Sequence, residues 1–372
     1  MNQRLHFRFF AHSWVSDWNH GNAHFLRGLV RELIRVGHKV RCYEELGAWS
    51  LKNLVTNEKD IAVEAIDAFR QTYPEIDVRF YQQDDKLSEF LDTELRGADV
   101  VVLHEWNDPR LVNAVLERKK RLGFRVLLHD THHRAYTAAA EILRFHLHLV
   151  DGVLAFGDTI RRIYQDGFGI PKVWTFHEAA DTSVFRPLNH EKTCDLLWVG
   201  NWGDEERTRE LMEFLIGPAH QLPHRKVLVY GVRYPELGVR ALKEAGIEYR
   251  GYLPNLSAPV AYAHSRLALH VPRRQYTNGL SGIPTIRVFE ALACGATLVC
   301  APWKDAENLF RPGEDYLIAE NGEKMTATID ELVRDESARR QIARNGLETV
   351  LSRHTCQHRA TELLEICGEL NR

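Results

Sequence analysis

Short apolar runs alternate with helical patterns along the whole of this chain, and this alternation restricts its possible folds more than any other feature. Runs such as 99–104 and 195–199 are typical of strands that are buried on both faces of a parallel sheet. The segments between such runs, for example 23–36, repeat apolar residues at helical spacing. Strands that are separated by helices predict an α/β fold with parallel sheets covered by helices.

The pattern runs through the chain twice. We expect strands at 5–11, 38–43, 77–81, 99–104, 125–129, 152–156 and 172–176, and then at 195–199, 226–230, 248–252, 267–271, 297–301 and 316–318. A length of 372 residues favours two domains, because a domain usually has about 100–200 residues. We predict two tandem Rossmann-like, doubly wound domains, 1–180 and 193–353, joined by a linker at 181–192 and separated by a cleft. The last segment, 354–372, is expected to be a helix that packs back on the first domain.

Composition excludes several classes of protein. The net charge of −3 arises from interspersed acids and bases, without the basic block that is typical of nucleic-acid binders. The six cysteines are scattered and include no CxxC pair, which favours reduced core residues. No apolar run approaches the roughly 18 residues of a membrane span, and the first residues are too polar for a signal peptide. We expect a cytoplasmic protein without a transmembrane segment.

The segment 278–295, NGLSGIPTIRVFEALACG, gives the most specific indication of a site. It places a glycine-bearing loop before a helix that is predicted to begin near Pro284 or Thr285 and to end at Gly295. The start of a helix offers unpaired N–H groups and the positive end of the helix dipole, and both attract anions.

Glu290 lies about a turn and a half into this helix, with Arg287 one turn before it on the same face. A carboxylate at this place is suited to both hydroxyls of a ribose, while the helix start holds the phosphates. The segment therefore indicates a nucleotide site. The alternative is an ordinary loop–helix–strand unit that carries a glutamate and binds nothing.

Further polar residues follow predicted strands of the second half. Gly200 and Asn201 come directly after 195–199, and Arg207 begins the next helix, where its guanidinium suits a diphosphate. Arg273 and Arg274 follow the strand at 267–271, and we choose Arg274 as the one that points to the ligand. The alternative for Arg207 is a solvated helix residue.

In the first half, the run LLHDTHH places His129, Asp130 and His132 at a strand end, beside Glu105 at the end of the neighbouring strand. A catalytic or sugar-contacting role is the interpretation that we favour, with Glu105 as a possible general base. Zinc is an alternative for the His-x-x-His spacing, but no further ligand is arranged as in zinc signatures. The other alternative is that these are ordinary polar residues at the end of a strand, with no role in chemistry or binding. The loop 14–21, with Trp14, Trp18 and His20, has the aromatic and polar composition of many carbohydrate sites.

Several quoted segments together resemble a known family. They are HEAADTSVFRP (177–187), VGNWGDEERTREL (199–211), HVPRRQYTNGLSGIPTIRVFEALACGATLV (270–299), FRPGEDYLIAENGE (310–323) and RNGLETVLSRHTCQHR (344–359). In this order they resemble GT-B glycosyltransferases of the family related to spore maturation proteins, whose second half is similar to glycosyltransferase family 4. The resemblance is strong from about 152 to 359, and it extends more weakly to 21–40.

The resemblance implies a nucleotide-sugar donor, with UDP as the commonest nucleotide, bound mainly by the second domain. The acceptor, bound by the first domain, is a hydroxyl-bearing glycan, lipid-linked intermediate, metabolite or protein. No metal or other cofactor is implied, since the protein supplies the cations. Carried over by position, the resemblance assigns Glu290 to the ribose and Leu253 to the base. It assigns the diphosphate to Arg207, to Arg274 and to the backbone N–H groups of 283–285 apart from Pro284, which has none. His129 is the residue that would approach the donor sugar.

One position departs from the resemblance. Family-4 enzymes usually carry Glu-x7-Glu, and the place of the first glutamate is occupied by Gly282. A retaining reaction with the diphosphate as base and an inverting one with Asp130, His132 or Glu105 as base both stay open. So does a catalytically inactive GT-B module that binds nucleotide or glycan. An epimerase or a phosphorylase of the same architecture is a further alternative without separate evidence.

Overall fold

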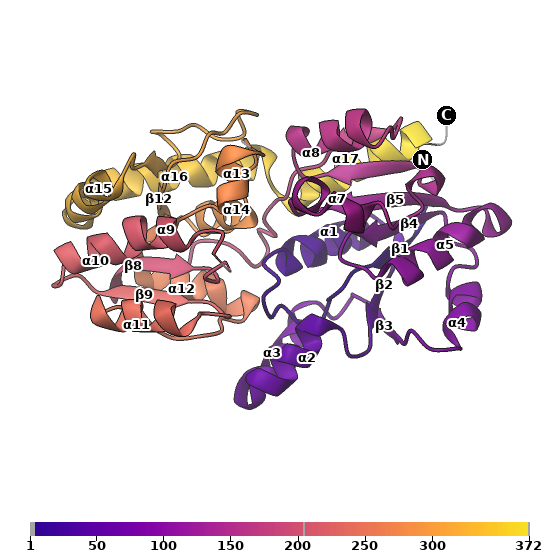
Figure 1. Ribbon diagram of the computed structural model, residues 1–372, viewed down its shortest axis with the longest axis horizontal. Coiled ribbons are helices and arrows are strands. Elements are labelled where there is room, and N and C mark those ends of the chain that lie inside the picture. Colours follow the sequence, from indigo (N-terminus) through magenta and orange to yellow (C-terminus); the bar gives the residue numbers. More distant parts are fainter. Residues whose placement is uncertain (1–3, 204, 281, 371–372) are drawn as a thin grey trace. The chain divides into compact units, whose positions relative to one another are not determined.

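The structure, a computed structural model, describes residues 4–203, 205–280 and 282–370 of the chain. The chain divides into two compact units: unit 1 is Met1–Glu178 with Cys356–Arg372, and unit 2 is Ala179–Thr355. Each unit contains one parallel sheet with helices packed around it (Figure 1). The predicted fold class, two doubly wound α/β domains, is confirmed.

The sheet of unit 1 has seven strands in the order β3-β2-β1-β4-β5-β6-β7, and every pairing is parallel. The strands are β1 (His6–Phe10), β2 (Lys39–Glu45), β3 (Val78–Tyr81), β4 (Val100–His104), β5 (Arg125–Asp130), β6 (Gly152–Ala155) and β7 (Val173–Thr175). The strand order reverses between β1 and β4. In sheets of this kind ligands bind beyond the carboxyl ends of the strands at such a reversal.

The helices of unit 1 lie between these strands, except for the last one. They are α1 (Ala23–Arg35), α2 (Trp49–Asn57), α3 (Lys59–Thr72), α4 (Leu87–Glu94), α5 (Pro109–Leu122), α6 (Arg134–Thr137), α7 (Ala139–Ile142), α8 (Asp158–Arg162) and α17 (Cys356–Leu370). Short helical turns also occur at Leu147–Leu149 and Ile163–Gly167. The α17 helix comes from the end of the chain and packs on α1, where Cys356 Sγ lies 3.7 Å from the carbonyl oxygen of Phe25.

The sheet of unit 2 has six parallel strands in the order β10-β9-β8-β11-β12-β13. They are β8 (Cys194–Val199), β9 (Val227–Tyr230), β10 (Glu248–Tyr249), β11 (Ser265–His270), β12 (Thr297–Cys300) and β13 (Leu317–Ile318). The order repeats that of the first six strands of unit 1, with the reversal between β8 and β11. Each unit thus has one switch point at which a ligand site is expected.

The helices of unit 2 complete the second doubly wound layer arrangement. They are α9 (Thr208–Leu211), α10 (Gly217–Gln221), α11 (Glu236–Glu244), α12 (Ala258–His264), α13 (Arg274–Asn278), α14 (Ile286–Ala293), α15 (Gly322–Arg334) and α16 (Glu336–Arg353), with helical turns at Met212–Ile216 and Asn255–Ser257. The ends of α14 are as predicted: Thr285 is its N-cap, and Gly295 lies just beyond it at a φ of +64°. The N–H groups of Gly295 and Ala296 donate to Leu292 and Ala291, which closes a Schellman motif.

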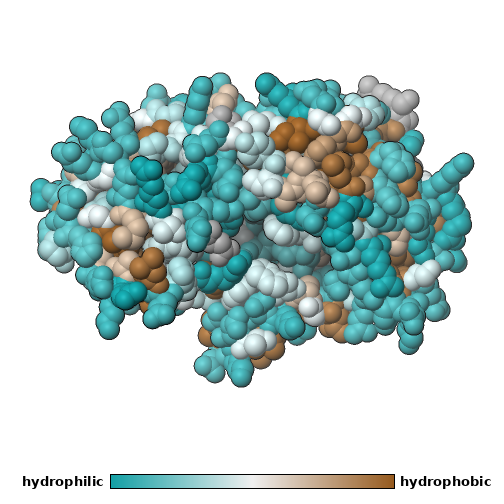
Figure 2. Space-filling model, in the orientation of Figure 1, coloured by the Kyte–Doolittle hydropathy of each residue, from teal (hydrophilic) through white to brown (hydrophobic). Residues whose placement is uncertain are grey.

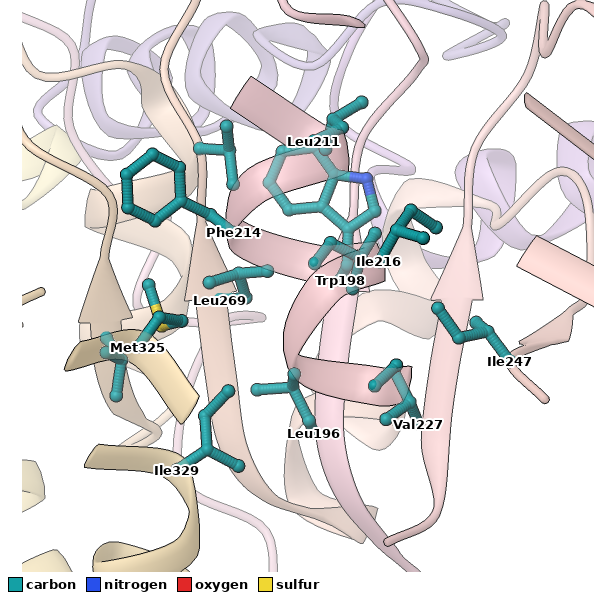
Figure 3. Close-up of a cluster of buried hydrophobic side chains, with 14 of the residues drawn as sticks. Leu196, Trp198, Leu211, Phe214, Ile216, Val227, Ile247, Leu269, Met325 and Ile329 are labelled. Atoms are coloured by element: carbon teal, nitrogen blue, oxygen red, sulfur yellow. The ribbon is translucent and has the colours of Figure 1, made fainter. Parts of the chain in front are cut away.

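The core of unit 2 extends up to the carboxyl end of its sheet. Trp198 from β8 packs with Leu211 and Phe214 from the following helical segment, and Leu196 and Val227 lie deeper (Figure 3). Trp198 is 1 % exposed, and its Nε1 atom donates to Tyr234 Oη at 3.0 Å. This buried indole packs against Gly200, in the segment that follows β8.

The outer surface is largely hydrophilic on the face drawn in Figure 2, where apolar residues form separate patches. Among the described residues, no helix is long and apolar enough to span a membrane.

Two local features differ from the expectations. The strand expected at 248–252 ends at Tyr249, because Gly251 turns the chain at a φ of +70°. Helices α2 and α4 were not predicted.

Candidate functional site

The switch point of unit 2 gathers most of the residues that the sequence indicated. Gly200 and Asn201 directly follow β8, and His270 ends the neighbouring strand β11. The start of α14 reaches the same place, because His270 Nε2 lies 3.2 Å from the hydroxyl of Thr285. The side chain of Thr285 does not cap α14, so it leaves the N–H groups of the first turn to other partners.

Arg207 is the main cation at this switch point. It donates from Nη1 to the carbonyl oxygen of Val271 at 2.9 Å and from Nη2 to Asn201 Oδ1 at 3.1 Å. Its guanidinium carbon lies 5.4 Å from the centre of the Trp198 ring. Burial, and then the charge of Arg273, lower the pKa of Arg207 to about 9. Within the described part of the chain no carboxylate lies within ion-pair distance of Arg207, so it is a half-buried cation short of an anion.

Two glycines make room for this arrangement. A Cβ atom at Gly200 would come within 2.6 Å of the Trp198 ring. A Cβ atom at Gly203, where φ is +83°, would lie 2.7 Å from Arg207 Nε. Both positions therefore exclude any side chain as long as Arg207 and Trp198 keep their places.

Glu290 is fully buried in the middle of α14 and forms an ion pair with Arg287. Asn255, 4 % exposed, donates to Glu290 Oε1 at 3.4 Å. Asn255 follows Leu253, which is half-buried, in the loop after β10. Glu290, expected to bind a ribose, is thus linked through Asn255 to the loop that carries Leu253, the residue expected to contact the base.

Gly282, the position that departs from the family resemblance, has a φ of +106°. A Cβ atom there would lie 2.5 Å from the Cβ atom of Ala306. A glutamate therefore does not fit this backbone without movement of the loop that carries Ala306.

Arg273 and Arg274 both form ion pairs within unit 2. Arg273 pairs with Glu206, and Arg274 donates to both carboxylate oxygens of Glu210 at 2.9 and 3.1 Å. The side chain of Arg274 is 44 % exposed. Arg207 thus contacts another candidate residue, Asn201, at the switch point, whereas Arg274 lies in a surface ion pair. Pro284 is buried in front of α14.

In unit 1 the predicted strand-end residues do come together. His104 of β4 is paired in register with His129 of β5, and their rings lie 5.6 Å apart. Glu105 is fully buried; its Oε2 atom is 3.0 Å from His104 Nδ1, and its Oε1 atom accepts from the Thr131 hydroxyl at 3.3 Å. Burial raises the pKa of Glu105 to about 8.

Asp130 is also buried, and both of its oxygens are engaged. Oδ2 accepts from the Tyr164 hydroxyl at 2.7 Å, and Oδ1 accepts from the His132 N–H at 2.9 Å. Burial and the neighbouring Glu105 raise the pKa of Asp130 to about 8. The His132 ring lies 5.0 Å from that of Trp106. The carboxylate is thus held by groups of the protein itself.

The described residues include no group of three or more His, Cys, Asp or Glu side chains arranged to hold a metal ion. The aromatic faces expected in the loop 14–21 are not available, since Trp14 and Trp18 are only 1 % and 4 % exposed. Their indoles pack in the core of unit 1 instead.

Sequence reasoning missed Asn255 and His270 in unit 2 and His12 in unit 1. His270 and His12 stand at or just after a strand end, as the predicted residues do, so the same signal applied to them. Asn255 shows no such signal, because its contact with Glu290 depends on how a loop folds over α14.

The fold of the chain is found in several solved structures. The chain is similar over its full length to the HepE protein of Anabaena in complex with UDP-glucose, with a TM-score of 0.69, 12% identity and coverage of 98% and 100% of the two chains. It is similar to sucrose-phosphate synthase from Thermosynechococcus elongatus, with a TM-score of 0.66, 13% identity and 99% coverage of both chains. It is also similar to an α-glucosyltransferase in complex with UDP and a DNA containing an HMU base, with a TM-score of 0.68, 12% identity and coverage of 98% of this chain and 100% of that one. The protein therefore has the GT-B fold of glycosyltransferases.

The sequence comparison covers a smaller part of the chain. Residues 207–365 match the family model described as glycosyl transferase-like. This match begins at Arg207 and includes α14. No curated protein sequence matches the chain significantly.

Proposed function

We propose that the protein is a glycosyltransferase that moves a sugar from a UDP-linked donor to a hydroxyl group of an acceptor without a metal ion. The observation that carries this proposal is Arg207, a half-buried cation without a carboxylate partner in the described residues, at the switch point of a GT-B unit. The UDP-glucose complex of the similar Anabaena protein supports the choice of nucleotide. We also propose that the chain belongs with the family related to spore maturation proteins and that unit 2 is of the family-4 type.

The donor is assigned to unit 2. A guanidinium has five N–H donors, and the two bonds of Arg207 to Val271 and Asn201 leave donors for a diphosphate. The first turn of α14 adds N–H groups and a positive dipole end. Glu290, held by Arg287 and Asn255, is assigned to the ribose hydroxyls, and Leu253 to the base.

The chemistry follows from where charge develops. The bond between the sugar C1 atom and the diphosphate oxygen breaks, and its electron pair stays on the leaving UDP. The acceptor oxygen forms the new bond to C1, and its proton passes to a base. Because negative charge grows on the diphosphate, Arg207 and the start of α14 stabilise the transition state more than the ground state. A protein cation at this place removes the need for a metal ion.

Calorimetric titration with UDP in the presence of EDTA tests the donor site. We expect saturable binding that weakens about 10- to 100-fold in Arg207→Gln, the loss of one charge-assisted contact of about 1.5–3 kcal/mol. Arg274→Gln is the matched variant, since it removes a guanidinium that is already paired with Glu210. A larger effect at Arg274 than at Arg207 would move the diphosphate to α13.

A catalytically inactive GT-B module is the second candidate, and Gly282 is the observation that favours it. A glutamate that contacts the donor sugar does not fit at this position, because a Cβ atom would lie 2.5 Å from Ala306. Hydrolysis of UDP-glucose in water separates the two functions. Slow release of glucose supports a transferase, whereas tight UDP binding with no release from any common UDP-sugar supports the binding module.

A further inference from the structure

A second arginine near the switch point of unit 2, Arg273, has no role in the proposed function. It stands three residues after the end of β11, and its side chain is 22 % exposed. In the described part of the chain its one acidic partner is Glu206, with which it forms an ion pair. Glu206 directly precedes Arg207 in the sequence, so this ion pair lies next to the residue that carries the proposed function.

The two segments that carry these arginines are fastened to each other within unit 2. The Arg207 guanidinium donates to the carbonyl oxygen of Val271 at 2.9 Å. In the opposite direction, the N–H group of Arg274 donates to the carbonyl oxygen of Glu206 at 3.0 Å. Neither contact involves the side chain of Arg273. The two segments therefore stay together when that side chain changes its partner.

The charges of Arg207 and Arg273 act on each other. After burial, the charge of Arg273 is the largest influence that lowers the pKa of Arg207, while Glu206 acts more weakly in the opposite direction. Two cations and one carboxylate leave one positive charge uncompensated among these three side chains. Like charges that lie close together are unfavourable unless an anion is shared between them. The pair of arginines therefore favours a ligand with more than one negative charge.

A sugar diphosphate donor has such a charge. Its diphosphate carries two negative charges, and a third appears when the sugar leaves. Arg207 supplies one positive charge, so a site without a metal ion needs a second cation. Arg287 neutralises Glu290, which is fully buried and would be unfavourable without a partner. Arg274 is bonded to both carboxylate oxygens of Glu210. Both of these arginines are thus committed to other anions.

The ion pair of Arg273 is suited to an exchange of anions. Only its Nη1 atom contacts Glu206 Oε2, and among the described residues the Arg273 side chain makes no other hydrogen bond. A guanidinium has five N–H donors, and a phosphate accepts two of them in parallel. The side chains of the pair are 22 % and 24 % exposed, and ion pairs that water reaches contribute little to stability. The guanidinium can therefore turn from Glu206 to a diphosphate.

Glu206 keeps its place during such an exchange. Its Oε1 atom accepts from Gln275 Nε2 at 3.1 Å, and its N–H group donates to the carbonyl oxygen of Gly203 at 2.8 Å. These contacts do not depend on Arg273. The carboxylate thus stays near the bound diphosphate, where its negative charge opposes that of the ligand.

We propose that Arg273 is the second cation of the donor diphosphate site, and that Glu206 is a built-in counter-ion, which the diphosphate displaces from Arg273. This inference rests on the proposed function and concerns the same site in unit 2. Arg207 and Arg273 bind the diphosphate together, and the ion pair with Glu206 forms again when UDP leaves. The counter-ion keeps the affinity for UDP below the value that the two arginines alone would give. It therefore favours the release of the product.

Calorimetric titration of the full chain with UDP in EDTA tests the inference with two variants that break the same ion pair. Arg273→Gln removes a cation, and we expect UDP to bind about 10-fold more weakly. Glu206→Gln keeps an acceptor oxygen for Gln275 and removes the negative charge. We expect this variant to bind UDP about 2- to 5-fold more tightly, because Arg273 no longer has to leave a carboxylate. An ion pair that only stabilises the fold would not give opposite signs.

Glu210→Gln is the matched control. It removes the same kind of charge from the neighbouring pair with Arg274, and its UDP affinity should equal that of the wild type. Arg273→Lys keeps the positive charge without the planar fork, so its UDP affinity should lie between those of the wild type and Arg273→Gln. Urea denaturation of each variant checks that it folds.

Three results would overturn the inference. Weaker binding in both Arg273→Gln and Glu206→Gln would give the ion pair a structural role alone. Equal UDP affinity in Arg273→Gln and the wild type would remove Arg273 from the diphosphate site. An increase in affinity in Glu210→Gln as large as that in Glu206→Gln would make the effect one of net charge and not of a counter-ion.

The failure of the proposed function gives a different pattern. In that case UDP does not bind to the wild type or to any variant. Saturable binding of UDP to the wild type together with one of the three contrary results rejects the exchange at Arg273 and leaves the donor site at Arg207 in place.

Discussion

Gly203 lies next to the proposed diphosphate site without contributing a side chain, and Gly203→Ala is therefore a sharp test of how Arg207 is held. The new methyl group would lie 2.7 Å from Arg207 Nε and 3.2 Å from its Cγ atom. Contacts under 3.0 Å do not persist, so either the backbone at residue 203 or the Arg207 side chain must shift, and we expect the side chain to move and to weaken its contacts with Val271 and Asn201. The substitution also strains the backbone, because φ at this position is +83°.

The two effects have separate magnitudes. The left-handed conformation costs an alanine about 1–2 kcal/mol, which lowers the free energy of unfolding. Displacement of Arg207 removes a charge-assisted contact of about 1.5–3 kcal/mol from the bound diphosphate, and UDP should bind about 10- to 100-fold more weakly. The tenfold figure applies if the displaced guanidinium still contacts the phosphate from a different position.

Calorimetric titration with UDP and urea denaturation measure the two effects separately. Gly313→Ala is the matched control, since its φ is +87° and a Cβ atom there meets nothing within 4 Å. The control should lose stability to a similar extent and keep its UDP affinity. Equal UDP affinity in Gly203→Ala, Gly313→Ala and the wild type would refute the role of Arg207.

The remaining predictions concern the ribose, the buried carboxyl groups and the core. Glu290→Gln should weaken UDP binding about 10- to 100-fold in titration, because the ribose hydroxyls lose a charged acceptor; unchanged affinity would separate α14 from the nucleotide. Glu105 and Asp130 bind a proton more tightly in the folded protein, with pKa values of about 8, so the unfolding free energy should fall as the pH rises from about 4 to about 8. Urea midpoints across this range check the sign, and Glu105→Gln should flatten the slope. Leu242→Ala, at a fully buried site of unit 2, should cost about 2–5 kcal/mol in the same denaturation assay.

The sequence predicted the strands well because parallel strands are buried on both faces. The strands β4 and β8 are buried at every position, so each is a continuous apolar run or nearly so, which contrasts with the mixed segments around it. Helices α2 and α4 were harder to see, since most of their residues are exposed or only half-buried and their apolar stripes are narrow. β10 was predicted too long, because the left-handed turn at Gly251 is a tertiary feature.

The candidate sites were predictable in so far as they follow strand ends. Glu290, Arg207, His129 and Asp130 all occupy such positions or the helix that follows them, so position along the chain was informative. The orientation of the side chains was not predictable from position. Whether the Arg274 side chain points to a ligand or to Glu210 depends on where the five-residue helix α13 begins. Contacts between segments that are far apart in the sequence, such as that of Asn255 with Glu290, were not predictable either.

The central claim is that unit 2 binds a nucleoside diphosphate through Arg207 and Glu290, and a calorimetric titration of the full chain with UDP, GDP and dTDP in EDTA tests it most directly. We predict saturable, metal-independent binding that favours UDP. The absence of binding by any of the three nucleotides would contradict the claim.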